Sequence, residues 1–259
     1  AADEVAYDIT RAFIQAQLPY VIAEKPAAPS PEKMLELGMI SAKNNVEFGV
    51  KYQKLHHPEF AAILHKAKAF SKNLKDHAGA RVQIELFATD TSEPVVKPNR
   101  DPQFYNQGTH LFSLAGALEA ALNVSFTRFD AITDKGKEWK DSSYAAATLS
   151  TNDFRVICRI SMARTSDGDS KDTMWVRLFD AEKDATAIST STLSSECVGK
   201  GWETMWDKAF EHQMQAICKA VLAGKSLAGA VVSAEDASRT LKLAEECHKD
   251  ASRKMLIRD

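Results

Sequence analysis

The hydrophobic positions of this chain change their period part-way along the sequence. In the first part, apolar residues recur every three or four positions, which predicts amphipathic helices over residues 5–17, 31–44 and 58–74. Short apolar runs at 20–23 and 46–50 lie between these helices and predict buried strands. The order helix, strand, helix, strand, with connections of this length, is typical of a parallel sheet.

Beyond Gly79 the apolar residues alternate instead. Val82, Ile84 and Leu86 are separated by charged or polar residues, which predicts a strand with one face in the core and one face in water. The same reasoning predicts further strands at 124–132, 144–149, 155–162, 174–179 and 186–193. Helical spacing returns at 104–122, 203–223 and 234–252.

These patterns predict an α/β protein of two domains. Residues 1–52 are expected to form the C-terminal remnant of a Rossmann-type, dinucleotide-binding parallel sheet. Residues 53–259, where the strand signals become antiparallel, are expected to form an α+β domain. The helix that begins at Pro58 is assigned to this second domain.

Composition excludes several classes of partner. The chain has 259 residues, 44% of them apolar, and a formal net charge of -2, so no strong field favours nucleic acid or an anionic membrane surface. Its apolar stretches are far shorter than the roughly 18 residues that a membrane span requires. We therefore expect no nucleic-acid binding, no membrane insertion, and a soluble protein of the cytoplasm or an organelle matrix.

The sequence Glu24-Lys25-Pro26 directly follows the predicted strand at 20–23. In open α/β sheets the carboxyl ends of the strands line the ligand crevice, and the ligand there is usually a dinucleotide. No Gly-rich phosphate loop precedes this strand in the printed sequence, and Gly199-Lys200-Gly201 lacks a third glycine and the strand-to-helix context. Lys25 is therefore either a lysine of a ligand crevice or a strand-end lysine in a turn set by Pro26.

Histidines offer two further candidates. His110 lies near the start of a helix with apolar neighbours, so it is either a functional residue or a hydrogen-bonded core or capping histidine. His56 and His57, with His65 two turns of helix later, resemble a metal-binding group. Adjacent histidines rarely bind one ion together, and we expect no metal.

Several segments together resemble one known family. These are Leu18 to Pro26 with its E-K-P ending, Val46 to Val50, His57-Pro58 at the start of a basic helix, and Asn106-Gln107-Gly108-Thr109-His110, which is similar to a D-x-G-x-H helix. The order and spacing of these segments resemble the glucose-fructose oxidoreductase, inositol dehydrogenase and rhizopine-catabolism family (Gfo/Idh/MocA). The region from Phe210 to Asp236 is also similar to the C-terminal end of that family, so the resemblance covers nearly the whole chain.

The resemblance implies a two-domain, NAD(P)-dependent oxidoreductase that acts on a sugar, a polyol or a related alcohol or carbonyl compound. It also implies that the second domain holds a large, mostly antiparallel, open-faced sheet with helices on one side, through which such proteins often pair. In the family the lysine of E-K-P positions and protonates the reacting oxygen, and the histidine relays the proton. These roles would fall on Lys25 and His110. The residues on the cofactor side would be Glu24, Lys25, Pro26 and Lys51.

One position departs from the family pattern. Asn106 stands where the family has an aspartate, and an amide can neither take a proton nor stabilise a charged imidazole; the loss of a nearby carboxylate lowers the pKa of a histidine. Two functions remain open. The protein is either an enzyme that uses NAD or NADP when the N-terminal half of the nucleotide domain is present, or a non-catalytic homologue that serves as a scaffold or subunit. Either form is expected to assemble, as a homodimer or a hetero-complex, through the open sheet.

Overall fold

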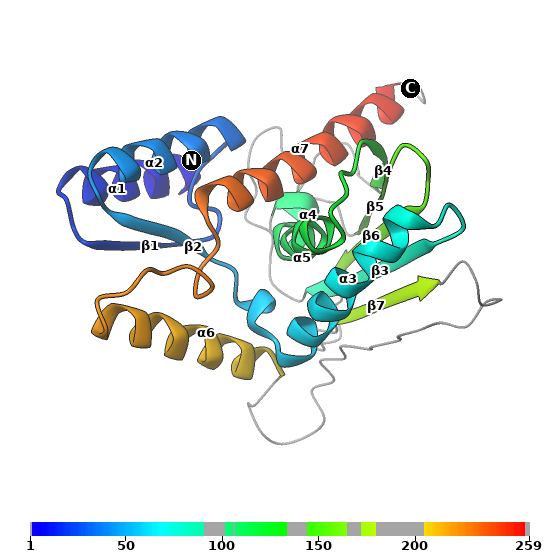
Figure 1. Cartoon of the computed structure of the whole chain (residues 1–259). Helices are drawn as coiled ribbons and strands as arrows, with labels where there is room; N and C mark the ends of the chain where they lie inside the picture. The colour runs from blue at the N-terminus through cyan, green and yellow to red at the C-terminus, as the bar shows by residue number, and fades with distance from the viewer. Residues whose placement is uncertain are drawn as a thin grey trace, which may run out of the picture. The chain divides into compact units, whose positions relative to one another are not determined.

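The structure is a computed structural model that describes residues 2–90, 102–105, 107–133, 144–164, 172–179 and 205–256. Contacts along the chain divide it into two compact units (Figure 1). The first unit comprises Ala1–His57 with Trp206–Leu243, and the second comprises Pro58–Met205 with Ala244–Asp259. Each unit is described by itself below.

The first unit is built around a two-stranded parallel sheet. Helix α1 (Ala2–Gln15) leads into strand β1 (Tyr20–Glu24), and helix α2 (Pro31–Lys43) leads into strand β2 (Glu47–Lys51). The strands pair in parallel from Tyr20 opposite Glu47 to Glu24 opposite Lys51. A short 3-10 helix, η1 (Gln53–His56), follows β2, and the long helix α6 (Met205–Leu222) and the first part of α7 (Ala234–Leu256) return to this unit. The predicted parallel strand pair is therefore confirmed.

Local sequence signals explain where these elements begin and end. The Ser30 hydroxyl accepts a hydrogen bond from the Lys33 amide at 3.3 Å, and Pro31 occupies the first helical position, so α2 begins with the cap that its sequence predicts. At β2, Val50 and Val232 exchange two backbone hydrogen bonds of 2.9 and 3.0 Å. Gly49 has no room for a side chain there, because a Cβ would overlap Val231 and lie 3.2 Å from the Val232 carbonyl oxygen.

The observed division differs from the expected one at 1–52 and 53–259. Residues 53–57 and 206–243 group with the first unit, although their helices had been assigned to the second domain. The bridge between Val50 and Val232 is the physical reason, since it makes the returning chain a neighbour of β2. Helical periodicity in a sequence identifies an apolar face but does not identify the unit that covers it.

The second unit holds a five-stranded mixed sheet with the order β4-β5-β6-β3-β7. The strands are β3 (Arg81–Asp90), β4 (Arg128–Thr133), β5 (Tyr144–Ser150), β6 (Val156–Arg164) and β7 (Asp172–Phe179). Three of the neighbouring pairs are antiparallel, and only β3 and β6 run parallel. The expectation of a large, mostly antiparallel sheet is confirmed, while the predicted strand at 186–193 and the glycines at 199 and 201 lie outside the described residues.

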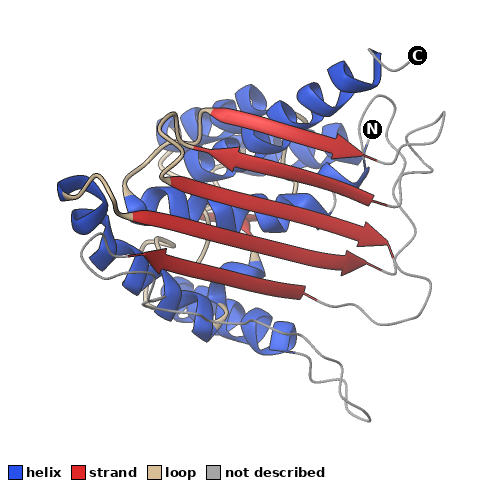
Figure 2. Cartoon of the chain, turned by 90° about the vertical axis from the view of Figure 1, so that its right-hand side faces the viewer, coloured by secondary structure: helices blue, strands red, loops and turns tan. Residues whose placement is uncertain are grey.

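The two faces of this sheet differ sharply (Figure 2). On one face Val82, Ile84 and Leu86 are buried, and the helices of the unit pack there. On the other face Glu85 lies opposite Arg159, and no described helix of this unit covers it. The sheet is therefore open on one side, as the resemblance implied.

Helix α5 (Gln107–Leu122) forms the centre of the core of the second unit. It packs against α3 (Pro58–Asp76) and against the sheet, after the short helix α4 (Pro102–Tyr105). Phe112 and Leu118 are fully buried because α3 and the sheet cover the faces of α5 on which they lie. Within the described part of the chain, no helix combines the length and the apolar character that crossing a lipid bilayer demands.

Candidate active site

The carboxyl ends of β1 and β2 bring together the predicted cofactor-side residues of the first unit. Glu24 is the last residue of β1 and lies directly opposite Lys51, the last residue of β2. Lys25 follows at once and is joined to Pro26 by a cis peptide bond, and its side chain is partly exposed. The edge of a parallel sheet at which the strands end is the usual ligand side of an α/β fold.

Lys51 is held between a carboxylate and an aromatic ring. Its Nζ lies 2.8 Å from Glu24 Oε2 and 4.7 Å from the centre of the Phe210 ring. A cation over an aromatic face is attracted by the ring quadrupole, so Phe210 on α6 helps to fix the Lys51 ammonium. Phe210 is 44% exposed. No signal in the sequence linked it to Lys51.

Tyr52 directly follows Lys51, the last residue of β2, and its side chain lies in the core of the first unit. The residue is fully buried, and burial together with the nearby Glu24 carboxylate raises the pKa of its phenol above the usual range. Tyr52 therefore keeps its proton at neutral pH.

The histidines that suggested a metal site do not share one unit. His56 and His57 belong to the first unit, whereas His65 lies on α3 in the second. Burial, and then the charge of His212 on α6, lower the pKa of His56, so this imidazole is neutral at pH 7. Among the described residues, no group of three or more potential ligands is arranged to hold a metal ion.

His110 is placed in the second unit, on the first turn of α5. It is 6% exposed, its neighbour Thr109 is fully buried, and its carbonyl oxygen accepts a hydrogen bond of 2.7 Å from the Ser113 hydroxyl. Asn106, which precedes α5, lies outside the described residues. Close to the helix start, the Tyr105 ring packs edge-on against His248 of α7 at 5.7 Å between ring centres. Sequence analysis did not single out His248.

The two predicted proton-handling residues therefore belong to different units. Lys25 lies at the sheet edge of the first unit, and His110 lies at the buried start of α5 in the second. Each has surroundings that suit its predicted role, because one is accessible at a strand end and the other is a desolvated imidazole. That the two meet at one substrate stays a prediction.

Similarity to known proteins is found when structures are compared, but not when the sequence is compared. No protein-family model and no curated protein matches the sequence. Among solved structures, a protein from Sinorhizobium meliloti 1021 assigned as a myo-inositol dehydrogenase is similar over 97% of this chain and 77% of its own, with 18% identity and a TM-score of 0.71. GenD2 from gentamicin A biosynthesis, in complex with NAD, is similar over 96% and 74%, with 14% identity and a TM-score of 0.70.

A third structure adds a bound polyol. The scyllo-inositol dehydrogenase from Lactobacillus casei, with NAD(H) and scyllo-inositol, is similar over 96% of this chain and 75% of its own, with 13% identity and a TM-score of 0.66. The chain has the mixed α/β fold of Gfo/Idh/MocA-type dehydrogenases. The resemblance found in the sequence is thus confirmed for the fold, and identities this low carry the likeness no further.

Proposed function

We propose that the protein is an NAD(P)-dependent oxidoreductase that acts on a sugar, a polyol or a related alcohol. The observation that carries the proposal is the Glu24-Lys25-Pro26 turn at the carboxyl end of a parallel strand pair, in a chain with the fold of polyol dehydrogenases. The non-catalytic alternative gains no support from the comparisons, since the similar structures named above are dehydrogenases or hold NAD.

The proposed chemistry needs a proton acceptor beside the reacting carbon. When hydride leaves a carbinol carbon, the hydroxyl proton must pass to a group with a pKa near the working pH. We assign the first contact with the hydroxyl to Lys25 and the onward transfer to His110, since lysine and histidine can both serve when their environments adjust their pKa values. Asn106 would orient a partner by hydrogen bonding but could not accept the proton.

The cofactor would supply or accept the hydride. The described residues of the first unit could contact only one part of it. Glu24, Lys25, Pro26 and Lys51 lie at the sheet edge where a nicotinamide would be placed. A pyrophosphate also needs backbone amides at the start of a helix that follows a Gly-rich turn. No described segment of the first unit has that form, so we assign only the nicotinamide side to these residues.

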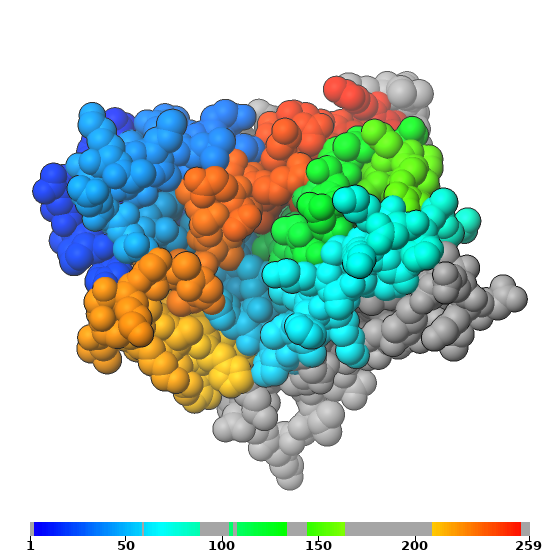
Figure 3. Space-filling model, in the orientation of Figure 1, coloured from blue at the N-terminus to red at the C-terminus, as the bar shows by residue number. Residues whose placement is uncertain are grey.

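An apolar stripe on α1 supports a larger nucleotide-binding unit. Val5, Ile9 and Phe13 follow one another along one side of the helix and are 57%, 50% and 50% exposed. Figure 3 shows α1 and α2 in blue at the surface of the first unit. Exposed apolar stripes of this kind usually mark a surface that another element covers. No described strand pairs with the outer edge of β1, and a parallel strand with its helix added there would complete the sheet.

The open sheet of the second unit supports the proposed assembly. Phe87, Ile132 and Tyr144 are 36%, 49% and 36% exposed, and Phe87 and Ile132 lie on the uncovered face by strand alternation. We propose pairing through this face, as a homodimer or with another subunit, and sedimentation of the purified chain as a clean monomer would count against the homodimer. Residence in the cytoplasm or an organelle matrix stays a prediction.

The function is tested by a direct spectrophotometric assay of the wild-type protein and of variants at Lys25, His110 and a control lysine. Purified protein is assayed with NAD+ and NADP+ against inositols and other polyols, and absorbance of the reduced cofactor is recorded. Lys25→Met and His110→Gln are each expected to lower kcat/KM by at least about a hundredfold, the contribution typical of positioned acid–base groups. Lys43→Met, at an exposed position on α2 of the same unit, is the control and should leave the rate unchanged. A fully active Lys25→Met variant would refute the assignment.

A further inference from the structure

A pocket of about 850 Å³ lies in the second unit, at the opposite end of β3 from the chain that leads to His110. It is open to solvent and forms where the end of α3, the start of β3 and the turn between β5 and β6 come together. In Figure 3 the cyan residues of α3 and β3 adjoin the green residues of this turn. The residues that matter here are Lys75, Asp76, Arg81, Asp153, Phe154 and Arg155. The volume lies within the roughly 300–1,000 Å³ of small-molecule sites.

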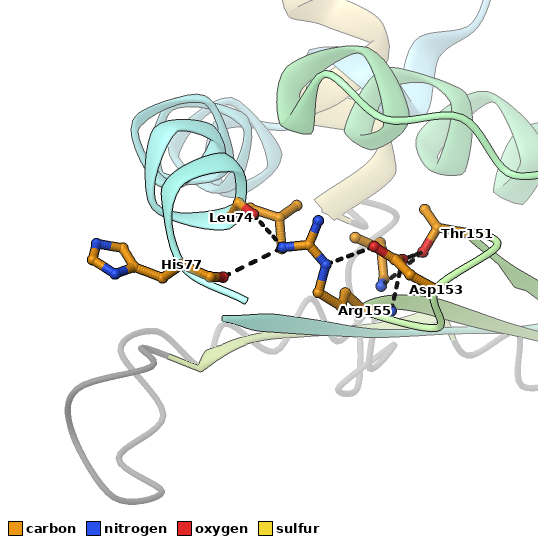
Figure 4. Close-up of polar contacts among 6 residues, drawn as sticks. Leu74, His77, Thr151, Asp153 and Arg155 are labelled. Carbon is orange, nitrogen blue, oxygen red and sulfur yellow. Dashed lines mark hydrogen bonds and ion pairs between the residues drawn. The ribbon is translucent and has the colours of Figure 1, made fainter. Parts of the chain in front are cut away.

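Arg155 ties the turn to the end of α3 (Figure 4). Its Nη1 donates hydrogen bonds to the carbonyl oxygens of Leu74 at 2.5 Å and His77 at 3.3 Å. The last carbonyl groups of a helix have no helical donor, so the guanidinium supplies one to Leu74, while the His77 carbonyl also accepts a hydrogen bond from the Ala80 amide at 3.1 Å. The wall of the pocket is therefore held in place before any ligand arrives.

Asp153 completes this fixed wall. Its carboxylate accepts hydrogen bonds from the Thr151 hydroxyl at 2.6 Å, the Arg155 amide at 3.1 Å and the Arg155 Nε at 2.6 Å. The Thr151 hydroxyl and then Arg155 lower the pKa of Asp153 to about 2, so the carboxylate stays charged. Since Asp153 and Arg155 neutralise each other, neither determines the net charge of the pocket.

Two other cations of the lining have no ion-pair partner among the described residues. Lys75 and Arg81 line the same pocket, and neither forms an ion pair or a side-chain hydrogen bond with any described residue. Asp76 is the one other acid on the lining and is likewise without such a bond in the described part of the chain. The pocket thus presents an ammonium and a guanidinium against a single carboxylate, which favours an anion.

Phe154 gives the pocket an aromatic edge. It is 52% exposed and has a φ of 57°, a left-handed conformation that bulky residues rarely adopt. The Arg128 guanidinium lies 4.6 Å from the centre of the ring and helps to hold it. A strained, exposed aromatic residue is costly to keep, and such residues concentrate at ligand sites.

We propose that this pocket binds a phosphorylated small molecule. The phosphate would lie between Lys75 and Arg81, because a guanidinium and an ammonium together match a dianion, and the organic part would pack on the Phe154 ring. The lining of this site includes neither Lys25 nor His110. It does not depend on the proposed oxidoreductase activity.

The test uses two probes that share a phosphate and differ in their organic part. Inorganic phosphate and phenyl phosphate are titrated into the purified full chain at constant ionic strength, with binding followed by calorimetry. Both should bind saturably, phenyl phosphate about tenfold more tightly because of the Phe154 ring. Lys75→Gln and Arg81→Gln should each weaken both probes by about tenfold or more. Lys72→Gln, which removes an exposed charge one turn earlier on α3, should leave binding unchanged.

A second variant separates the aromatic contact from the charge. Phe154→Gly suits the left-handed backbone, so the turn should keep its shape while phenyl phosphate loses its advantage over inorganic phosphate. The proposal is overturned if neither probe binds saturably. It is also overturned if Lys75→Gln and Arg81→Gln bind as well as the wild type, or weaken no more than Lys72→Gln.

Discussion

Helices α1 and α5 have similar numbers of apolar residues but differ in how far these side chains are buried. On α5, Phe112 and Leu118 are fully buried, because α3 and the sheet cover the helix from several directions. On α1, Ile14 is fully buried, but Ile9 and Phe13 are half exposed on another side. The core of the second unit is therefore complete around its central helix, whereas the first unit has more apolar surface than its own described elements can cover.

The sheets show the same difference. The five-stranded sheet of the second unit leaves a whole face open but pairs each internal strand on both edges. In the first unit, Val232 bridges to β2 at its outer edge, and β1 has no described partner on its outer edge. Among the described residues both sheets have outer strands with a free edge, β1 in the first unit and β4 and β7 in the second, but the first sheet has two strands against five and is the less complete of the two.

The largest expected effect contrasts these two helices directly. Leu118→Ala should lower the free energy of unfolding by about 3 kcal/mol, because it opens a cavity in a fully buried position. Ile9→Ala should change it by less than about 0.5 kcal/mol, since half of that side chain is already in water. Urea unfolding followed by circular dichroism measures both values. Equal losses would mean that α1 is covered in solution by something in the purified protein.

Alanine substitutions at two glycines, one in each unit, test how tightly each position is packed. Gly49→Ala should destabilise the first unit by about 2 kcal/mol, because its Cβ would overlap Val231 beside the bridged edge of β2. Gly116→Ala on α5 has open space around the new methyl group and should stabilise by about 0.5 kcal/mol through helix propensity. Thermal unfolding should move in opposite directions for the two variants, and a neutral Gly49→Ala would show that the returning segment does not press on β2.

The smallest expected effect concerns acid stability of the second unit. The pKa of Asp153 is about 2 in the folded protein against an ordinary value of 3.8, so the folded state takes up this proton less readily. Its stabilising contribution is present above pH 4 and is lost as the pH falls toward 2. The side chain is half exposed, so solvent screening keeps the contribution below about 1 kcal/mol. Asp153→Asn should flatten this part of the stability profile, and an unchanged slope would contradict the assignment.

The sequence predicted local elements well because their signals are local. The alternation of Val82, Ile84 and Leu86 identified β3, and the helical spacing of the apolar residues over 31–44 identified α2. The return of residues 206–243 to the first unit was not predictable, since no local pattern records which surface a helix will cover. The contact between Lys51 and Phe210 depends on that return and was missed for the same reason.

The pocket at the end of α3 was missed for a related reason. Arg155 is separated in sequence from Leu74 and His77, and only the fold brings their backbone carbonyls within its reach. At the site itself, Lys25 was predicted from its strand-end position, and Glu24 and Lys51 from the family resemblance. The parallel register of β1 and β2 explains why Glu24 and Lys51 lie opposite each other. Parallel strands end at one edge, so their terminal residues can be grouped before any coordinates exist.

The account depends on Lys25 lying in the site where cofactor and polyol meet. Lysine acetylation with a mild reagent, read residue by residue by mass spectrometry, measures this with and without NAD+ and scyllo-inositol. We predict that the two ligands together slow the modification of Lys25 severalfold and leave that of the exposed Lys43 on α2 unchanged. An unaltered rate at Lys25 under ligand concentrations that support turnover, or an equal slowing at Lys43, would contradict the account.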